Sequence, residues 1–259
     1  MKIKIGKEKK ARIQEGMMGL FFEDINYAAD GGLYAEMLEN RSFEFLKATG
    51  DYKDYQTEYD GGYGWSAYPE GAGARLRCVS GSPHTEENPH YMRLQTEKPG
   101  EGIRNKAYDG IFLKEGMEYK LTFWARPVKF QGDFDIFIEK DGTRWAGAKI
   151  SAGDGQQETY NHFRRYEAVL QAKGTVENGV FALCLSEPGT VEFDFVSLFP
   201  ADAVCGIFRR DLFELLKDMG PGFLRFPGGC IVEGNTLANR YRFKDSLKPQ
   251  WARRNNWNR

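Results

Sequence analysis

The chain has 259 residues, and 36 Lys and Arg against 37 Asp and Glu leave a formal net charge of −1. This balance gives no overall field that would draw the chain to nucleic acid or to an anionic membrane. No run of roughly 18 apolar residues is present, so no transmembrane helix is expected. Aromatic residues make up 14% of the chain and 30 residues are Gly, which is typical of a β-rich protein with many turns.

The first stretch of the chain predicts two strands. Residues 2–5 alternate Lys and Ile, the pattern of a short half-buried strand. Residues 17–25 form a nearly continuous apolar run, which suits a strand buried on both faces of a parallel sheet. This run ends at Glu23 and Asp24, and active-site side chains follow such strands in barrel folds. Adjacent strand residues point to opposite faces, so at most one carboxylate reaches a pocket; a solvated strand end or a helix N-cap is the alternative.

Residues 45–200 show a different sequence pattern, in which clusters of turn residues separate short runs of alternating apolar and polar residues. Such runs occupy residues 119–124, 134–139 and 191–198. In the last of them, three apolar residues are expected on one face and three polar residues on the other: Phe193, Phe195 and Leu198 against Glu192, Asp194 and Ser197. Short alternating strands with frequent turns predict an antiparallel β-sandwich.

After residue 200 the period becomes helical. One apolar stripe recurs at steps of three and four residues: Phe208, Leu212, Leu215, Leu216 and Met219. Gly220 and Pro221 follow as a helix stop, and residues 223–226 then predict a short strand. The order strand, sandwich, helix, strand is that of a β/α unit whose first connection carries an inserted domain.

The bend after this second strand is the sharper candidate for a site. Gly228 and Gly229 let the backbone approach a ligand closely, and Pro227 stiffens the entry. Arg225, within an apolar strand, is costly to bury unless a carboxylate pairs with it. The segment is therefore either one wall of a ligand pocket or a tight turn with Arg225 in a structural ion pair.

The remaining motifs favour structural interpretations. Cys78, Cys184, Cys205 and Cys230 have no metal-ligand spacing, and we expect four reduced thiols, three of them in the core. No phosphate-binding loop or serine-nucleophile elbow is present, so no cofactor and no metal are predicted. The basic segment 240–259 is interpreted as a loop-rich rim, with a nucleic-acid patch as the less favoured alternative.

Four stretches carry a family resemblance: residues 19–26 (GLFFEDIN), 31–37 (GGLYAEM), 40–44 (NRSFE) and 208–230, which ends in RFPGGC. They resemble the N-terminal portion of an α-L-arabinofuranosidase of glycoside hydrolase family 51. The stretch between them is similar to the carbohydrate-binding-module-like sandwich that some members carry inserted at this place. The resemblance covers nearly the whole chain from about residue 17.

The resemblance implies a multi-domain chain of the α/β plus all-β class. Residues 1–44 and 201–259 would form a discontinuous part of a (β/α)8 TIM barrel, namely its first strand, first helix and second strand. Residues 45–200 would form the inserted, jelly-roll-like antiparallel β-sandwich. A closed barrel takes roughly 250 residues by itself, so we expect an incomplete barrel and interpret the chain as a fragment.

The implied activity is retaining hydrolysis of terminal arabinofuranosyl groups. In the family, residues that match Glu23 and Cys230 contact the arabinofuranose, and Arg225 would support the pocket wall. The acid/base and nucleophile Glu residues are expected beyond residue 259, so no catalytic residue is assigned. We therefore predict that the 259-residue chain alone hydrolyses no substrate.

Two alternatives concern the sandwich. It could be a non-catalytic sugar-binding module whose platforms are Trp65 and Trp145, which sit beside turns, while Trp124 belongs to the core. It could also be a structural spacer. The expected partner is an arabinofuranosyl-containing saccharide, with no nucleic acid and no membrane, and an oligomer of the intact enzyme is left open. No secretory signal is seen, so a cytoplasmic location is expected.

Overall fold

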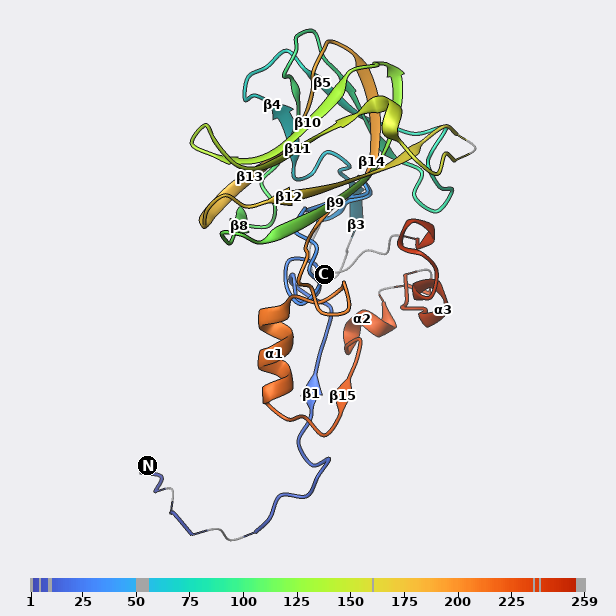
Figure 1. Ribbon diagram of the computed structural model, residues 1–259. Helices are drawn as coiled ribbons and strands as arrows, with labels where there is room; N and C mark the ends of the chain where they lie inside the picture. Colours follow the sequence, from blue (N-terminus) through green and yellow to red (C-terminus); the bar gives the residue numbers. More distant parts are fainter. Residues whose placement is uncertain are drawn as a thin grey trace.

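The computed structural model describes residues 2–4, 6–8, 11–49, 56–159, 161–234, 236–237 and 239–254. The prediction of a mostly β chain with few helices is confirmed. Two large antiparallel sheets form the upper body in Figure 1, and a small parallel pair of strands with a helix lies below them. No helix of the described part is long and apolar enough to cross a bilayer.

The strands of residues 65–200 form two large sheets, and the chain passes back and forth between them. The six-stranded sheet contains β4 (Trp65–Tyr68), β7 (Gly102–Asn105), β8 (Ile111–Leu113), β10 (Asp133–Lys140), β11 (Thr143–Ser151) and β13 (Val176–Leu185). The five-stranded sheet contains β5 (Arg75–Val79), β6 (Tyr91–Gln95), β9 (Glu118–Lys129), β12 (Arg164–Gln171) and β14 (Thr190–Pro200). A separate hairpin pairs β2 (Leu46–Thr49) with β3 (Gln56–Tyr59).

Aromatic side chains fill the space between these two sheets. Phe123 of β9 meets Phe134 of β10 edge to face, with ring centres 5.4 Å apart, and stacks on Tyr166 of β12 at 5.0 Å. All three side chains are almost completely buried. Burying one such side chain contributes roughly 1.5–3 kcal/mol. Because β9 and β10 belong to different sheets, these rings hold the sheets face to face.

Strand β14 departs from the expected alternation. Glu192 and Asp194 are 1% and 0% exposed, as buried as Phe193 between them. A register shift after Asp194 and a positive φ of 48° at Phe195 turn the Phe195 ring into the same outer cluster as Trp124. The sequence pattern therefore predicted the strand correctly. It did not predict that both faces of the strand are buried.

The lower body contains the two segments that flank the sheets. Strands β1 (Leu20–Phe21) and β15 (Leu224–Arg225) pair in parallel, with Leu20 opposite Leu224. Helix α1 (Arg210–Asp218) precedes β15, and Gly220 follows the helix with a φ of +60°. The expected helix and its stop are thus confirmed. The remaining elements are α2 (Cys230–Glu233), α3 (Phe243–Ser246) and the short 3-10 turns η1 (Ala152–Asp154) and η2 (Gln250–Ala252).

The strand expected at residues 2–5 is not found. Residues 2–4 have no regular structure, and the Ile3 side chain is 79% exposed. Ile5 lies outside the described residues. No strand of the described chain pairs with this segment, so its alternating pattern has no sheet to join.

A ladder of backbone hydrogen bonds joins the two linkers between the lower body and the sheets. The Arg209 amide donates to the Leu33 carbonyl oxygen at 2.9 Å, and the Ala35 amide donates to Ile207 at 2.8 Å. Further up, the Met37 amide donates to the Leu198 carbonyl oxygen at 2.9 Å. The two linkers therefore run side by side. The sheets lie above the carboxyl ends of β1 and β15 (Figure 1).

The C-terminal segment forms another attachment between the two bodies. Asn88, on the loop between β5 and β6, donates from its side-chain amide to the carbonyl oxygens of Trp251 at 3.0 Å and Arg253 at 2.9 Å. The Lys248 ammonium lies 3.2 Å from the Glu87 carboxylate. The described part of the basic segment 240–259 is thus attached to the loop between β5 and β6 by an ion pair and by hydrogen bonds to its own carbonyl oxygens.

Candidate functional site

The two segments singled out at strand ends lie side by side. Beyond the paired strands, the Phe22 amide donates to the Arg225 carbonyl oxygen at 2.9 Å, and the Asp24 amide donates to Pro227 at 3.0 Å. This continued pairing carries Glu23 to the level of the bend after β15. The carboxyl ends of two adjacent parallel strands therefore meet at one place, where barrel folds assemble their sites.

The Glu23 carboxylate holds this bend through one of its oxygens. Glu23 Oε1 accepts a hydrogen bond from the Gly229 amide at 3.1 Å and a longer one from the Ile231 amide at 3.4 Å. These amides surround the start of α2, so Oε1 satisfies backbone donors that the short helix leaves unpaired. Glu23 Oε2 makes no hydrogen bond to any residue that the structure describes. The Glu23 side chain thus accepts hydrogen bonds from amides at the start of α2, whose N-cap residue is Gly229, and has one oxygen left to accept a further donor.

Close packing against Glu23 explains the glycine at the bend. Gly228 has a φ of +151°, which L side chains rarely adopt. A Cβ atom added there would lie 2.7 Å from Glu23 Cγ and 2.6 Å from Ile231 Cγ2. A larger residue would therefore push Glu23 away from the bend.

Arg225 and Cys230 lie on either side of this bend. The Arg225 guanidinium carbon lies 4.5 Å from the centre of the Phe21 ring, a cation–π distance, and the side chain is exposed. No carboxylate of the described residues forms an ion pair with Arg225, so the structural ion pair considered as an alternative is absent there. Cys230 begins α2 as an exposed free thiol. The ends of the two paired strands thus carry a cation (Arg225), a carboxylate (Glu23) and, after the bend, a thiol (Cys230).

Comparison with known proteins gives a consistent result. A family model described as the alpha-L-arabinofuranosidase 1 domain matches residues 215–259. Alpha-L-arabinofuranosidase 1 of Arabidopsis thaliana is 33% identical over 254 residues, covering 93% of this chain and 35% of its own length. An extracellular exo-alpha-L-arabinofuranosidase of Streptomyces chartreusis is 31% identical, covering 96% of this chain and 30% of its own length.

A solved structure supports the same assignment. The arabinose-bound MgGH51 α-L-arabinofuranosidase superposes with a TM-score of 0.79 at 25% identity, covering 95% of this chain and 40% of that chain. These comparisons show that the chain is similar to α-L-arabinofuranosidases, including one of family 51. It corresponds to their N-terminal portion and spans about a third of the length of the curated relatives, 35% and 30% in the two cases above.

Trp65, one of the two tryptophans predicted as sugar platforms, is not one. Its side chain is 8% exposed and packs against Phe43 and Phe181 in the main core. The indole Nε1 donates to the Asn40 carbonyl oxygen at 3.0 Å, so even the polar edge is used internally. The prediction for Trp65 is wrong because Phe43, Phe181 and the Asn40 carbonyl oxygen enclose its ring.

The second predicted platform, Trp145, is only partly accessible to solvent. Trp145 on β11 is half-buried, and its ring packs on Gly174, where a Cβ would lie 2.6 Å from the six-membered ring. Trp124 is buried, as expected.

Of the thiols, Cys184 alone is buried, Cys78 is half-buried, and Cys205 and Cys230 are exposed. The expectation of three core cysteines is therefore wrong, because Cys205 lies in a surface turn and Cys230 begins an exposed helix.

A buried carboxylate whose role sequence reasoning missed, Glu36, joins the two linkers. Glu36 Oε1 accepts hydrogen bonds from the amides of Leu198 at 2.9 Å and Leu38 at 3.1 Å. Glu36 Oε2 accepts from the Ser197 hydroxyl at 2.5 Å and faces the Arg41 guanidinium at 3.4 Å. Burial raises the pKa of Glu36, and the Arg41 charge opposes that rise. The only sequence signal was a carboxylate inside an otherwise apolar stretch.

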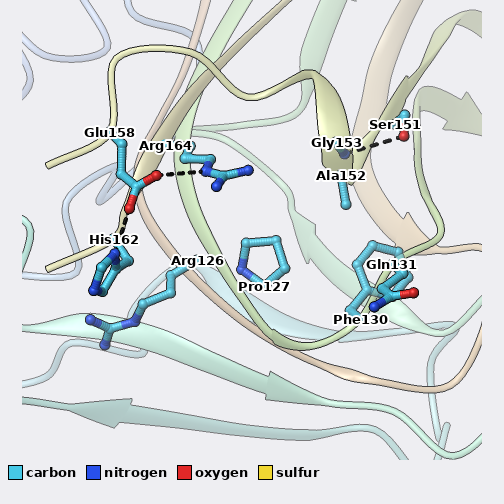
Figure 2. Close-up of a pocket in the computed structure, with 10 residues that line it drawn as sticks. All are labelled: Arg126, Pro127, Phe130, Gln131, Ser151, Ala152, Gly153, Glu158, His162 and Arg164. Atoms are coloured by element: carbon cyan, nitrogen blue, oxygen red, sulfur yellow. Dashed lines mark hydrogen bonds and ion pairs between the residues drawn. The ribbon is translucent and has the colours of Figure 1, made fainter.

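Two clefts open elsewhere on the described surface. One, of about 620 Å3, lies where the linkers meet the sheets, and in it Arg210 lies 3.4 Å from Asp202 and 3.2 Å from Glu214. The other, of about 470 Å3, lies on the sheets themselves (Figure 2). Neither cleft is lined by Glu23, Arg225 or Cys230.

Proposed function

We propose that this chain supplies one wall of the sugar pocket of a retaining α-L-arabinofuranosidase that removes terminal arabinofuranosyl groups from saccharides. The observation that carries the proposal is the contact between Glu23 and the Gly229 amide at 3.1 Å, which fixes the carboxylate at the carboxyl ends of two parallel strands. Glu23 Oε2 would accept a hydrogen bond from a sugar hydroxyl. Cys230 would line the pocket, and Arg225 would support its wall.

The chemistry of the intact enzyme would need two further carboxyl groups. In a retaining glycosidase one carboxylate attacks the anomeric carbon, and a carboxylic acid protonates the leaving oxygen and then activates water. Glu23 is tied to backbone amides and serves here as a binding residue, so neither role is assigned to it. The pair would come from barrel strands beyond residue 259, and the chain alone would not hydrolyse a glycoside.

The domain organisation supports the proposal that this chain contributes sugar-binding residues while other barrel strands contribute the catalytic carboxyl groups. Residues 1–44 and 201–259 would be the partial TIM barrel, since β1, α1 and β15 follow one another as strand, helix and parallel strand. Residues 45–200 would be the inserted carbohydrate-binding-module-like sandwich, supported by the two packed antiparallel sheets.

We also propose a cytoplasmic location. The four free cysteines support it, because reducing compartments keep thiols unpaired. The Streptomyces relative is named as extracellular, so cell fractionation with an antibody to this chain is the direct test.

Two measurements test the proposed activity. The 259-residue chain is incubated with 4-nitrophenyl α-L-arabinofuranoside, and we expect no release of nitrophenol above buffer. The chain is then alkylated with iodoacetamide with and without L-arabinose, and each cysteine is quantified by mass spectrometry. We expect arabinose to slow alkylation of Cys230 and to leave the equally exposed Cys205 unchanged. Turnover by the chain, or equal alkylation of Cys230 with and without arabinose, would contradict the proposal.

A further inference from the structure

The segment that follows Glu23, residues 25–32, is a compact loop whose turns are joined by backbone hydrogen bonds. The Ile25 amide donates to the Glu23 carbonyl oxygen at 3.0 Å, and the Ala28 amide donates to the Ile25 carbonyl oxygen at 3.0 Å. The Leu33 amide then donates to the Ala28 carbonyl oxygen at 2.9 Å, within the linker that reaches the sheets (Figure 1). A displacement of this loop therefore also displaces the backbone of Glu23.

Two adjacent residues of the loop have a backbone conformation that is unfavourable for L residues. Asn26 has a φ of 51° and Tyr27 a φ of 62°, both in the left-handed region. Asn tolerates this region because its short polar side chain can form local hydrogen bonds, whereas the bulky Tyr has no such compensation. Such a conformation persists only where the surrounding structure enforces it. We therefore looked for the groups that hold the Tyr27 side chain.

Two tyrosines of the upper body contact Tyr27. Tyr108, on the loop between β7 and β8, meets the Tyr27 ring edge to face, with ring centres 5.6 Å apart. Tyr63, on the loop before β4, is hydrogen-bonded to the Tyr27 side chain, and this bond raises the pKa of Tyr63 to about 12. The Tyr27 side chain is 59% exposed, so these two contacts attach an otherwise solvated ring to the sheets.

Tyr108 also packs against the other end of the same loop. A Cβ atom added at Gly31 would lie 2.7 Å from Tyr108 Cγ, so the ring lies directly on the Gly31 backbone. Gly31 has a φ of +80°, a conformation that glycine adopts without strain. Tyr108 thus contacts the loop after Glu23 at two points, and no other contact is needed to explain why the ring lies there.

The chain segment that carries Tyr108 is itself held by the core of the sheets. The Ala107 amide donates to Asn105 Oδ1 at 2.7 Å. Asn105 is completely buried, and its side-chain amide donates to the Glu39 carbonyl oxygen at 2.9 Å. Because these bonds fix the backbone next to Tyr108, the ring can serve as a rigid support for the loop after Glu23.

We infer that Tyr108 is a positioning residue of the proposed sugar pocket, which it serves by holding the loop after Glu23 in its strained shape. The inference rests on the proposed function of Glu23. Pairing with β15 holds the amides on either side of Glu23, and the loop holds its carbonyl oxygen, so both are needed to place the carboxylate. Tyr108 acts through Tyr27 and Gly31, and it gives the upper body a part in the pocket that requires no sugar contact by the sheets.

Two measurements on the 259-residue chain test the inference. Hydrogen–deuterium exchange follows the amides of residues 22–33, and we expect Tyr108→Ala to accelerate their exchange by about tenfold. Iodoacetamide alkylation of Cys230 at increasing L-arabinose then gives the concentration of sugar that halves the rate. We expect Tyr108→Ala to raise this concentration by up to about tenfold, the effect of losing one aromatic pair.

Three further variants separate positioning from a general loss of stability. Tyr108→Phe keeps the ring on Tyr27 and Gly31 and should behave as the wild type in both measurements. Tyr27→Ala removes the same contact from the side of the loop and should reproduce both effects, so the test does not depend on one variant. Phe112→Ala removes an exposed ring from the neighbouring strand β8 and should change neither result. Circular dichroism will establish that each variant is folded.

The possible outcomes distinguish this inference from the proposed function. If arabinose protects Cys230 in the wild type and protects it equally well in Tyr108→Ala and Tyr27→Ala, the inference is wrong and the proposed function stands. Unchanged amide exchange in both alanine variants, or an effect of Tyr108→Phe as large as that of Tyr108→Ala, would also overturn the inference alone. Failure of arabinose to protect Cys230 in the wild type would contradict the proposed function and the inference together.

Discussion

Glu23 Oε1 accepts a hydrogen bond from the Gly229 amide at 3.1 Å, although 206 positions separate the two residues. The contact closes the loop of chain that contains both large sheets. It also fixes the direction of the carboxylate, because the parallel pairing of β1 with β15 leaves little freedom to the backbone on either side. The geometry of the bend therefore depends on one long-range contact, and it can be tested by substitution.

Replacement of Glu23 should loosen the bend in a graded way. Glu23→Ala removes the acceptor of two amides, and we expect the free energy of unfolding to fall by about 1 kcal/mol, because the site is half-buried. Glu23→Gln keeps a carbonyl acceptor and should lose less. Urea denaturation followed by tryptophan fluorescence measures both. Equal losses for Ala and Gln would mean that the hydrogen bonds are not the stabilising element.

Gly228 should tolerate no side chain. In Gly228→Ala the new Cβ meets Glu23 Cγ at 2.7 Å at a φ of +151°, so we expect a loss of about 2 kcal/mol or more. Gly71→Ala is the matched control, since Gly71 has a φ of +78° but nothing within 4 Å of the added Cβ, and about 1 kcal/mol is expected. Thermal unfolding distinguishes the two. A control variant as unstable as Gly228→Ala would show that backbone strain, not crowding by Glu23, sets the cost.

A buried histidine should make the stability of the sheets sensitive to acid. His84 is 4% exposed, stacks on Trp124 at 4.0 Å, and has no hydrogen-bond partner for either ring nitrogen among the described residues. Burial lowers the pKa of His84 to about 4 from its usual 6.5. Below pH 6.5 the unfolded chain binds a proton that the folded chain does not, so stability is lost as the pH falls from 6.5 to 4.

The substitution His84→Phe keeps a stacking ring and removes this proton. We expect its free energy of unfolding to change less than that of the wild type between pH 6.5 and 4. The measurement is chemical denaturation at several pH values. A parallel pH profile for His84→Phe would show that other groups cause the acid sensitivity.

The attachment of the C-terminal segment to the sheets should depend on Asn88. Asn88→Ala removes the hydrogen bonds to the carbonyl oxygens of Trp251 and Arg253, and we expect amide exchange of residues 250–253 to accelerate by about tenfold. Thr85→Val removes only the 2.7 Å bond to Trp251 and should have a smaller effect. Hydrogen–deuterium exchange with mass spectrometry resolves these peptides. Unchanged exchange in Asn88→Ala would mean that other contacts hold the segment.

The sequence predicted the elements of the lower body because their signals are local. The stripe from Phe208 to Met219 and the stop at Gly220 specify α1, and the Pro-Gly-Gly run specifies the end of β15. The pairing of β1 with β15 also followed from the order of the elements. None of these predictions needed knowledge of which residues lie opposite one another in the sheets.

The incorrect predictions concern burial that distant segments provide. Asp194 and Glu192 were assigned by alternation, but the loop that carries His84 and the arginines of neighbouring strands cover the outer face of β14. Trp65 was assigned by its place beside a turn, but Phe43 and the Asn40 carbonyl oxygen enclose it. The role of Glu36 depends on the partners Ser197 and Leu198, which lie 161 and 162 positions away.

The paired linkers have a mechanical consequence. A domain tethered by two separate single chains can swivel, whereas one carried on a hydrogen-bonded ribbon resists bending and twisting. The backbone hydrogen bonds between Arg209 and Leu33, Ala35 and Ile207, and Met37 and Leu198 form such a ribbon, and the Asn88 contacts stabilise it from another side. The upper body is therefore held at a constant angle and distance from the bend at Glu23.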